Sequence, residues 1–263
     1  MKNKFFIVAI VATLFMSCSS DDSTGNTAIS TDYLPLTDGN YWTYDVIGQG
    51  LSNRDSLYIA NDTTINTKTY KKLKTLSLPF GFYSNSLRNN GLRKENDAIY
   101  MTGNSGLNLG NTLPIEISLS DLIIFKESAT ANQQLGSVSG TISQDFQGYP
   151  LIIDYTLKTT ALETLPSFTS PDNMVYTDIK KVKITLNLKV ATTIVGIPIP
   201  IAILNPQDVV VSTQYYAKNI GMVYNNTVIS YELVDLSAFG VTLPIPQSDT
   251  QTQEELLDLY QVN

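Results

Sequence analysis

The sequence predicts an all-β protein, and three observations support this fold class. Short segments rich in threonine, isoleucine, valine and tyrosine recur along the chain, separated by asparagine, aspartate and glycine. Apolar residues make up 43% of the 263 residues, which is enough to form a hydrophobic core. Residues 175–193 alternate apolar and polar side chains, as a strand with one buried face does. These features predict an antiparallel sandwich or a strongly curved open sheet.

The predicted strands follow one another in simple order. A turn at residues 37–40 leads into the first strand, and two-residue turns at 66–67 and 96–97 join later pairs. Asparagine and aspartate tolerate the positive φ of tight turns, which favours a hairpin at 96–97. We predict a strand at 120–126, with a helical turn as the alternative. The expected strands are residues 41–46, 56–65, 68–76, 92–95, 98–101, 120–126, 151–160, 175–193, 209–216, 221–224 and 228–234.

A short helix is predicted near the C-terminus. Thr252 and Glu255 fit a capping box, in which each side chain bonds a free backbone N–H at the start of a helix. Leu256, Leu257 and Tyr260 would then share one apolar face. We expect this helix to lie on the sheet.

Two short patterns recur in the same order in both halves of the chain. The pattern Tyr-x-x-aliphatic-Lys begins at Tyr70 and Tyr176, and the pattern Lys-x-x-x-x-aliphatic-Tyr begins at Lys94 and Lys218. We therefore predict two similar halves, degenerate copies of one β-meander with a loop inserted in the second. The copies would be residues 32–118 and 119–235, followed by a C-terminal segment, 236–263. Two half-sheets that each leave an apolar face exposed would pack together.

The N-terminus predicts a signal peptide and a lipid anchor. Lys2 and Lys4 precede an apolar run at residues 5–16, which suits a signal-peptide core and is too short to span a bilayer. Residues 15–18, Phe-Met-Ser-Cys, resemble the bacterial lipoprotein signal. The resemblance implies cleavage after residue 17 and lipidation of Cys18, with acyl chains such as palmitate holding the protein on a membrane. The alternative is an ordinary secretory signal with a chance cysteine.

The segment that follows, residues 18–31, is small, polar and acidic, which is typical of a flexible tether. It resembles the acidic export tags of Bacteroidota surface lipoproteins, which implies the outer membrane, at its periplasmic face or at the cell surface. A plain solvated linker is the alternative. Cleavage would remove two lysines and no acid, so the net charge of −7 becomes −9. This acidity disfavours nucleic-acid binding. Residues 32–263 are expected to form a single β domain.

A resemblance to a protein group rests on residues 33–44, which read Tyr-Leu-Pro-Leu-Thr-Asp-Gly-Asn-Tyr-Trp-Thr-Tyr. They resemble the opening strand of a broad group of uncharacterised Bacteroidota lipoproteins, with the pattern Pro-Leu-x-x-Gly-Asn-x-Trp-x-Tyr after the tether. Residues 66–74 and 216–224 are similar to the tyrosine-containing hairpins of that group. The resemblance implies a fold and a cellular address. It implies no chemistry, because no catalytic residues are established for the group.

Several catalytic classes are excluded by composition. The chain has no histidine, which excludes Ser-His-Asp and Cys-His catalysis and histidine zinc sites. Its single cysteine excludes an intrachain disulfide and a thiolate metal cage. The sequence contains no nucleophile elbow, phosphate-binding loop, dinucleotide fingerprint or calcium loop. We expect no enzymatic activity, no cofactor and no metal.

Two groups of residues are candidates for ligand binding. Trp42 and Tyr44 share one face of the first strand and would stack on a sugar, or else fill the core. Residues 194–204 are apolar and interrupted by two prolines, which exclude a central strand. Within them, Ile197 and Ile201 would form an apolar lip on a cavity or a docking patch. The alternative is a loop tucked over the core.

Paired carboxylates would serve a glycosidase, which needs two acids about 5–10 Å apart. Each candidate has a simpler explanation as a solvated acid at a turn or strand edge. The candidates are Asp45, Asp55, Glu95, Asp97, Asp121, Glu127, Asp145 and Asp154.

Three functions follow from these features. The missing catalytic motifs, acidic surface and tether favour a non-catalytic envelope protein that binds or scaffolds a partner, such as another envelope protein or a glycan. The apolar run, the C-terminal helix and the anchor favour a carrier of lipid or lipoproteins with an apolar cavity. A two-carboxylate carbohydrate-active enzyme is the third candidate.

Overall fold

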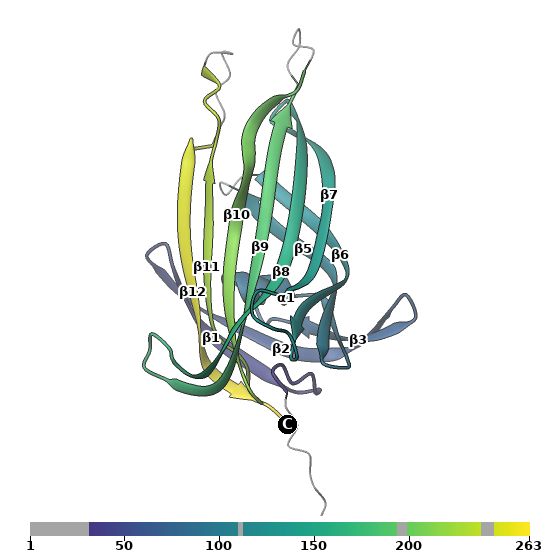
Figure 1. The fold of residues 1–263 in the computed structure, drawn as a ribbon, viewed down its shortest axis with the longest axis vertical. Helices are drawn as coiled ribbons and strands as arrows, with labels where there is room; N and C mark the ends of the chain where they lie inside the picture. The colour runs from purple at the N-terminus through teal and green to yellow at the C-terminus, as the bar shows by residue number, and fades with distance from the viewer. Residues whose placement is uncertain (1–31, 110–112, 194–198, 238–244) are drawn as a thin grey trace, which may run out of the picture. The chain divides into compact units, whose positions relative to one another are not determined.

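Long β-strands make up most of the computed structural model, which describes residues 32–109, 113–193, 199–237 and 245–263 (Figure 1). The N-terminal half contains β1 (Tyr41–Gly48), β2 (Leu51–Ile65), β3 (Lys68–Lys74), β4 (Gly91–Glu95), β5 (Ala98–Leu109) and β6 (Leu113–Lys126). The C-terminal half contains β7 (Gln134–Phe146), β8 (Tyr149–Thr169), β9 (Val175–Thr192), β10 (Ile201–Ala217), β11 (Gly221–Glu232) and β12 (Ser248–Gln261). Among the described residues, one short helix, α1 (Phe82–Leu87), lies between β3 and β4.

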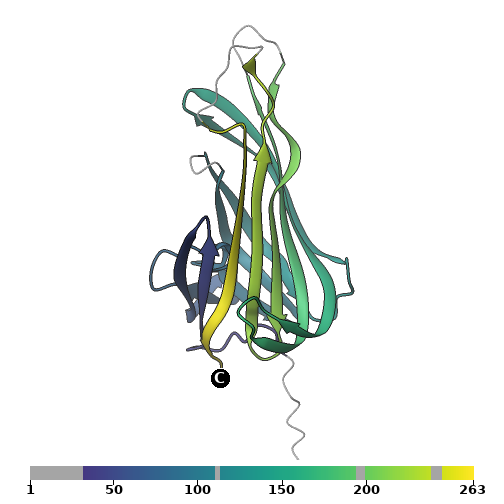
Figure 2. The same ribbon diagram turned by 90° about the vertical axis from the view of Figure 1, so that its left-hand side faces the viewer.

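The twelve strands form one antiparallel sheet that curves until it is nearly closed. Each strand pairs with the next in the chain, from β1 to β6 and from β7 to β12. The first and last strands also pair with each other, which gives the order β6-β5-β4-β3-β2-β1-β12-β11-β10-β9-β8-β7. Figure 2 shows β12, in yellow, beside β11. The all-β antiparallel prediction is confirmed, in its strongly curved form.

The predicted hairpin turns are confirmed. Asn66 and Thr67 join β2 to β3 with φ of 48° and 69°, as a two-residue turn of the type that matches strand twist requires. Asn96 joins β4 to β5 with φ of 55°. The segment at 120–126 belongs to β6 and is therefore strand, as expected.

The predicted C-terminal helix is wrong. Residues 252–260 belong to β12, which pairs with β1 on one side and β11 on the other. The capping signal of Thr252 and Glu255 contributes only about 1 kcal/mol to a helix. The strand instead satisfies the open edges of two neighbouring strands, which is a larger, non-local gain that the sequence pattern does not reveal.

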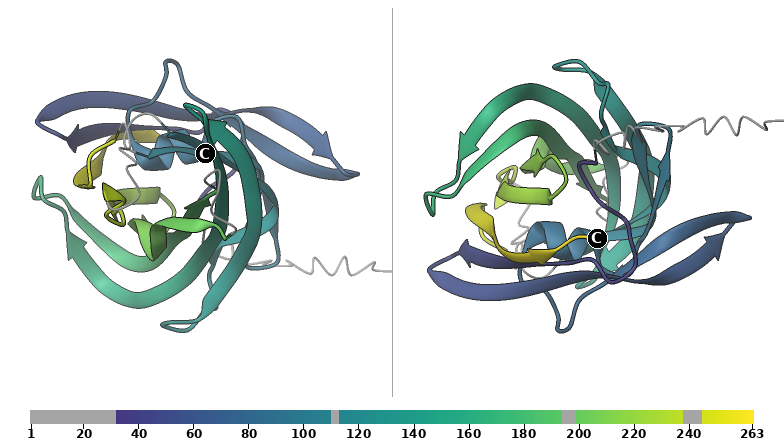
Figure 3. Two further views of the ribbon diagram at one scale, coloured as in Figure 1. Left: turned by 90° about the horizontal axis from the view of Figure 1, so that it is seen from above. Right: turned by 90° about the horizontal axis from the view of Figure 1, so that it is seen from below.

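The core lies on the concave side of the sheet, where α1 is also found (Figure 3). Tyr83 of α1 packs edge-on against Tyr44 and Tyr216, with 5.7 and 6.3 Å between ring centroids. The ring centroids of Phe125, from β6, and Tyr216 are 5.0 Å apart. Such aromatic pairs each contribute about 0.5–1.5 kcal/mol beyond their burial. The cluster therefore fixes α1 against strands from both halves of the sheet.

The sheet has a seam between β6 and β7, the two ends of the strand order. Gly136 of β7 lies against the backbone of Ile123, so that a Cβ there would be 3.0 Å from the Ile123 carbonyl oxygen. The hydroxyl of Thr159 donates to that same oxygen at 2.6 Å. Farther along, the Gln144 amide donates to the Pro114 carbonyl at 3.1 Å. Side chains and close packing thus hold the seam where backbone pairing ends.

Some predictions are not addressed by this structure. The duplication of residues 32–118 and 119–235 stays a prediction. The signal peptide, the tether and Cys18 lie outside the described residues. Within the described ranges, no helix has the length and hydropathy needed to cross a membrane.

Candidate functional site

The structure places the predicted aromatic binding residues in the core. Trp42 and Tyr44 are both fully buried. The indole N–H of Trp42 donates to the Ile220 carbonyl at 2.6 Å, and the Tyr44 hydroxyl donates to the Met222 carbonyl at 3.3 Å. Because both side chains are enclosed and bonded, neither presents a ring face to a ligand here.

The predicted apolar lip is described only in part. Ile201 is half-buried at the start of β10 and packs against the core. Ile197 lies outside the described residues. Ile201 is at the opposite end of β10 from Tyr216, which belongs to the same aromatic cluster as Tyr44. The structure therefore does not bring Ile201 together with Trp42 and Tyr44.

A cavity of about 610 Å³ lies beside α1 on the concave side of the sheet. Its wall comes from the residues around α1 and from β5, β6, β7, β11 and β12. The polar residues lining it are Asn85, Arg88, Asn104, Glu116, Gln144, Gln251 and Gln253. Apolar residues line the rest of the wall, namely Phe80, Phe82, Leu107, Pro114, Ile115, Ile142 and Ile229.

Most polar groups of the cavity wall are held in place by the protein itself. Gln253 accepts the backbone N–H of Phe82 at 2.6 Å and donates to the carbonyl of Phe80 at 2.9 Å. Gln251 donates to a carboxylate oxygen of Asp249 at 2.7 Å. These bonds fix the orientation of the wall before any ligand arrives, which lowers the entropic cost of binding.

Two buried carboxylates hold the segment that forms the cavity floor. Asp55 of β2 accepts the backbone N–H groups of Phe80 and Gly81 at 2.9 and 2.7 Å. Glu255 of β12 accepts the N–H of Tyr83 at 2.7 Å. A Cβ at Gly81 would lie 2.8 Å from Oδ2 of Asp55 and nearer still to Glu255, so only glycine fits there. Asp55 is one of the candidate acids named from the sequence, whereas no sequence pattern indicated that Glu255 would bind the same segment.

The burial of Glu255 changes its acidity. Burial raises the pKa of Glu255 to about 7, against the lowering effect of hydrogen bonds from Tyr83, Asn225 and Ser84. The nearby charge of Asp55 raises this pKa further. Both acids are covered by the backbone they bind, and neither lines the cavity. Their geometry is that of anchors for α1.

A buried ring of hydrogen bonds extends this anchor across three strands. The hydroxyl of Ser212 donates to Asn225 at 2.7 Å, and the hydroxyl of Thr227 donates back to Ser212 at 3.0 Å. The Asn225 amide donates to Thr227 at 3.0 Å and to Glu255 at 2.9 Å. Each polar group has a partner, as buried polar groups require. The carboxylate of Glu255 is therefore positioned by β10 and β11 as well as by its own strand.

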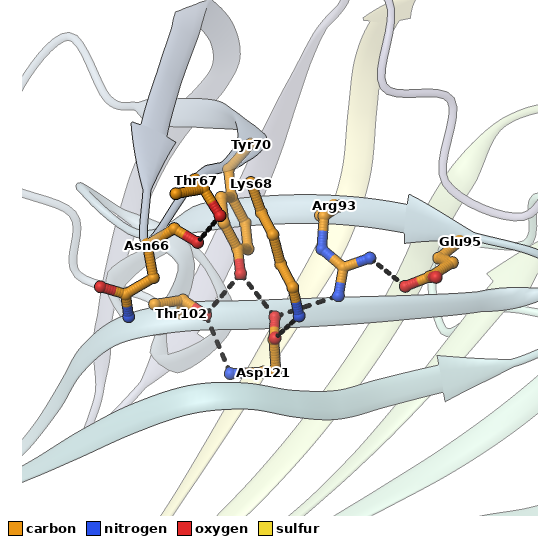
Figure 4. Close-up of polar contacts among 8 residues, drawn as sticks. All are labelled: Asn66, Thr67, Lys68, Tyr70, Arg93, Glu95, Thr102 and Asp121. Atoms are coloured by element: carbon orange, nitrogen blue, oxygen red, sulfur yellow. Dashed lines mark hydrogen bonds and ion pairs between the residues drawn. The ribbon is translucent and has the colours of Figure 1, made fainter.

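A second polar cluster surrounds Asp121 on β3 to β6 (Figure 4). Asp121 sits at a break in the pairing of β5 with β6 and has φ of 50°. Its carboxylate accepts hydrogen bonds from Lys68 at 2.6 Å, Tyr70 at 2.5 Å and Arg93 at 3.2 Å. Its own N–H donates to the hydroxyl of Thr102 at 2.9 Å. Through its side chain and its backbone N–H, this one residue joins four strands.

The hydrogen-bond donors of this cluster keep the carboxyl group of Asp121 ionised. Burial would raise the pKa of Asp121, but hydrogen bonds from Lys68, Tyr70 and Arg93 outweigh it and lower the pKa to about 2. Arg93 also pairs with Glu95 and lies 4.5 Å from the ring centroid of Tyr100. A carboxylate with such a low pKa is a poor proton acceptor near neutral pH. We interpret the Asp121 cluster as a structural clamp.

The other candidate carboxylates are scattered. Asp97 accepts the N–H of Ser128 at 3.1 Å, and Asp145 accepts the N–H of Gly148 at 3.0 Å, so both act as turn residues. Asp154 contacts Lys189 on the surface. Asp45 and Glu127 have no side-chain hydrogen bond among the described residues, and neither lines the cavity. Nowhere in the described residues do three acidic or cysteine side chains form a group that could hold a metal ion.

Comparison with known proteins identifies no family for this chain. No protein-family model matches the chain, and no curated protein matches its sequence. Among solved structures, the chain is similar to that of a "putative lipoprotein" from Parabacteroides distasonis ATCC 8503. The identity is 12%, the match covers 88% of this chain and 99% of that chain, and the TM-score is 0.38. A likeness this weak establishes neither a shared family nor a shared function.

Proposed function

We propose that the chain is a lipid-anchored protein of the outer membrane that binds a hydroxyl-rich ligand, such as a glycan, without transforming it. The observation that carries this proposal is the mixed lining of the cavity of about 610 Å³ beside α1. Ligand sites in proteins commonly have volumes of about 300–1,000 Å³ and a few fixed polar groups. The anchor rests on the lipoprotein-type signal at residues 1–18.

The chemistry of the lining favours a carbohydrate. Carboxamides such as Asn85 and Gln144 offer both donors and an acceptor, and a sugar hydroxyl also does both. Phe80 and Phe82 add aromatic surface on which the apolar face of a sugar ring packs. This combination supports binding of a neutral or weakly charged saccharide better than binding of a hydrocarbon chain.

The alternative of a lipid carrier finds less support. Two apolar cavities of the described residues, one near Phe146 and Leu204 and one near Leu157 and Val210, each hold only about 20 Å³. That is room for about one water molecule. An acyl chain would have to enter the larger cavity, where it would bury the charged group of Arg88.

Two measurements test the proposal. For the anchor, cells expressing the full chain are labelled with radioactive palmitate, and Cys18→Ala serves as the matched control. We expect label in the outer-membrane fraction for the wild type and none for the variant. Label that persists without Cys18, or a protein found only as soluble material, would contradict the anchor.

For the ligand, the full-length protein purified in detergent is applied to an array of bacterial, plant and host glycans. We expect retention of a subset of glycans, and weaker retention by a variant with Gln144→Leu in the cavity wall. Native mass spectrometry of the same preparation tests the alternative function. A bound lipid in addition to the anchor, with no glycan retained, would favour the carrier instead.

A further inference from the structure

The three arginines of the chain differ in their surroundings. Arg54 pairs with Asp258, and Arg93 pairs with Glu95 and Asp121. Arg88 lines the cavity and is half-buried, and no carboxylate of the described residues lies within 4.0 Å of its guanidinium. A partly desolvated charge without a counter-charge gains strongly from an anionic partner.

We infer that Arg88 recognises a carboxylate on the ligand, and that the cavity takes oligosaccharides that contain a uronic acid. This inference rests on the proposed function, because it names the ligand class of the same cavity. The planar guanidinium can bind both oxygens of a carboxylate through two parallel hydrogen bonds. The carboxamides and phenylalanines of the wall would contact the hydroxyls and the ring faces.

The backbone that carries Arg88 is held rigidly. Its own N–H donates to the Ser84 carbonyl at 3.0 Å, and the N–H of the next residue, Asn89, donates to the Leu73 carbonyl of β3 at 2.9 Å. Asn90 donates through its amide to the carbonyls of Ser86 and of Asn104, at 2.7 and 2.8 Å. A charged group presented from a fixed base binds with a smaller loss of entropy.

A single arginine limits the ligand to few negative charges. The other ionisable residue of the wall, Glu116, is exposed between the buried Ile115 and Ile117 of β6, so its carboxylate lies on the opposite face of the strand, where it bonds Asn104. Arg88 would therefore meet the ligand without a second charged side chain beside it. This arrangement favours a monoanionic sugar unit over a densely charged polyanion.

Isothermal titration calorimetry on the full-length protein in detergent tests the inference. The probes are an aldotriouronic acid, which carries one carboxylate, and a hyaluronan tetrasaccharide, which carries two, each compared with its methyl ester, which has nearly the same shape without the charge. The variants are Arg88→Gln and Arg88→Lys, and Arg54→Gln is the control because Arg54 lies outside the cavity.

We expect at least one acid probe to bind the wild type tenfold or more tightly than its ester. Arg88→Gln should abolish that preference, Arg88→Lys should keep part of it, and Arg54→Gln should leave it unchanged. Equal melting temperatures for the wild type and Arg88→Gln would show that the fold is intact.

Two results would overturn the inference in distinguishable ways. Acids and esters that bind equally well, unaffected by Arg88→Gln, would remove the role of Arg88 while leaving a saccharide-binding cavity. A protein that binds neither these probes nor any glycan on the array would overturn the proposed function as well.

Discussion

The carboxyl group of Glu255 should make the stability of the fold depend on pH. Burial raises its pKa to about 7 from the ordinary value of 4.5, so the folded state keeps a proton that the unfolded chain releases between these values. The fold is therefore more stable below pH 4.5 and loses this advantage as the pH rises through 7. The loss amounts to about 3 kcal/mol at most.

Few groups other than Glu255 titrate between pH 5 and 8, because the chain has no histidine. We expect the melting temperature to fall across that range in the wild type and to stay level in Glu255→Gln. Glu232→Gln, at an exposed position, is the control and should keep the wild-type slope. A Glu255→Gln variant that melts with the same pH slope as the wild type would refute the assignment.

The clamp at Asp121 can be tested without disturbing the backbone. Asn tolerates the φ of 50° found there, so Asp121→Asn removes the negative charge and leaves the turn intact. We expect a loss of about 1–3 kcal/mol in urea denaturation, because Lys68 and Tyr70 lose their charged acceptor. Asp154→Asn removes an exposed pair with Lys189 and should cost about 0.5 kcal/mol or less. Equal losses for the two variants would argue against the clamp.

Among the structural elements, hairpins with local turn signals could be predicted and β12 could not. Asn66, Thr67 and Asn96 adopt the positive φ that their turns require, so each turn fixes its own two strands. The pairing of β12 depends on β1, some 210 residues away, and no local signal specifies it. One face of β12 does carry an alternating set of residues, Asp249, Gln251, Gln253 and Glu255. Thr252 and Glu255 also fit the capping box of a helix, however, and that local pattern led to the wrong prediction.

The seam between β6 and β7 predicts a sharp difference between two glycines. A Cβ at Gly136 would lie 2.8 Å from Cδ1 of Leu122 and 3.0 Å from the carbonyl oxygen of Ile123, so Gly136→Ala must push the seam open. We expect a loss of about 1–3 kcal/mol in thermal unfolding. Gly106→Ala is the control, since its nearest neighbour would be 3.9 Å away, and it should be neutral or slightly stabilising. Equal melting temperatures for the two variants would show that the seam accommodates a Cβ at Gly136 without loss of stability.

Across the whole molecule, the candidate site is created by closure of the sheet. The cavity wall combines residues around 80–88 with others near 104–116, 142–144, 229 and 251–253. No pattern in the sequence links these segments, because their proximity follows from the strand order. Arg88 also gave no signal, because the six residues of α1 have no side-chain N-cap and no charged residues at either end that would predict a helix. By contrast, the burial of Trp42 and Tyr44 followed the alternation of a single strand, so core filling was already the simpler expectation.

Because β12 lies between β1 and β11 in the sheet, we predict that the fold requires this last strand. A chain that ends at Gln247 lacks β12, which leaves the edges of β1 and β11 unpaired and removes Glu255, an anchor of α1. We expect this chain to aggregate or to show no cooperative thermal transition by circular dichroism. A chain ending at Gln261 keeps all of β12 and loses two hydrogen bonds from Asn263 to Asn40 and the partly buried side chain of Val262, so it should melt within a few degrees of the full-length protein. Cooperative melting of the shorter chain near the full-length temperature would mean that the other eleven strands fold without β12, and that its contacts with α1 contribute little to stability.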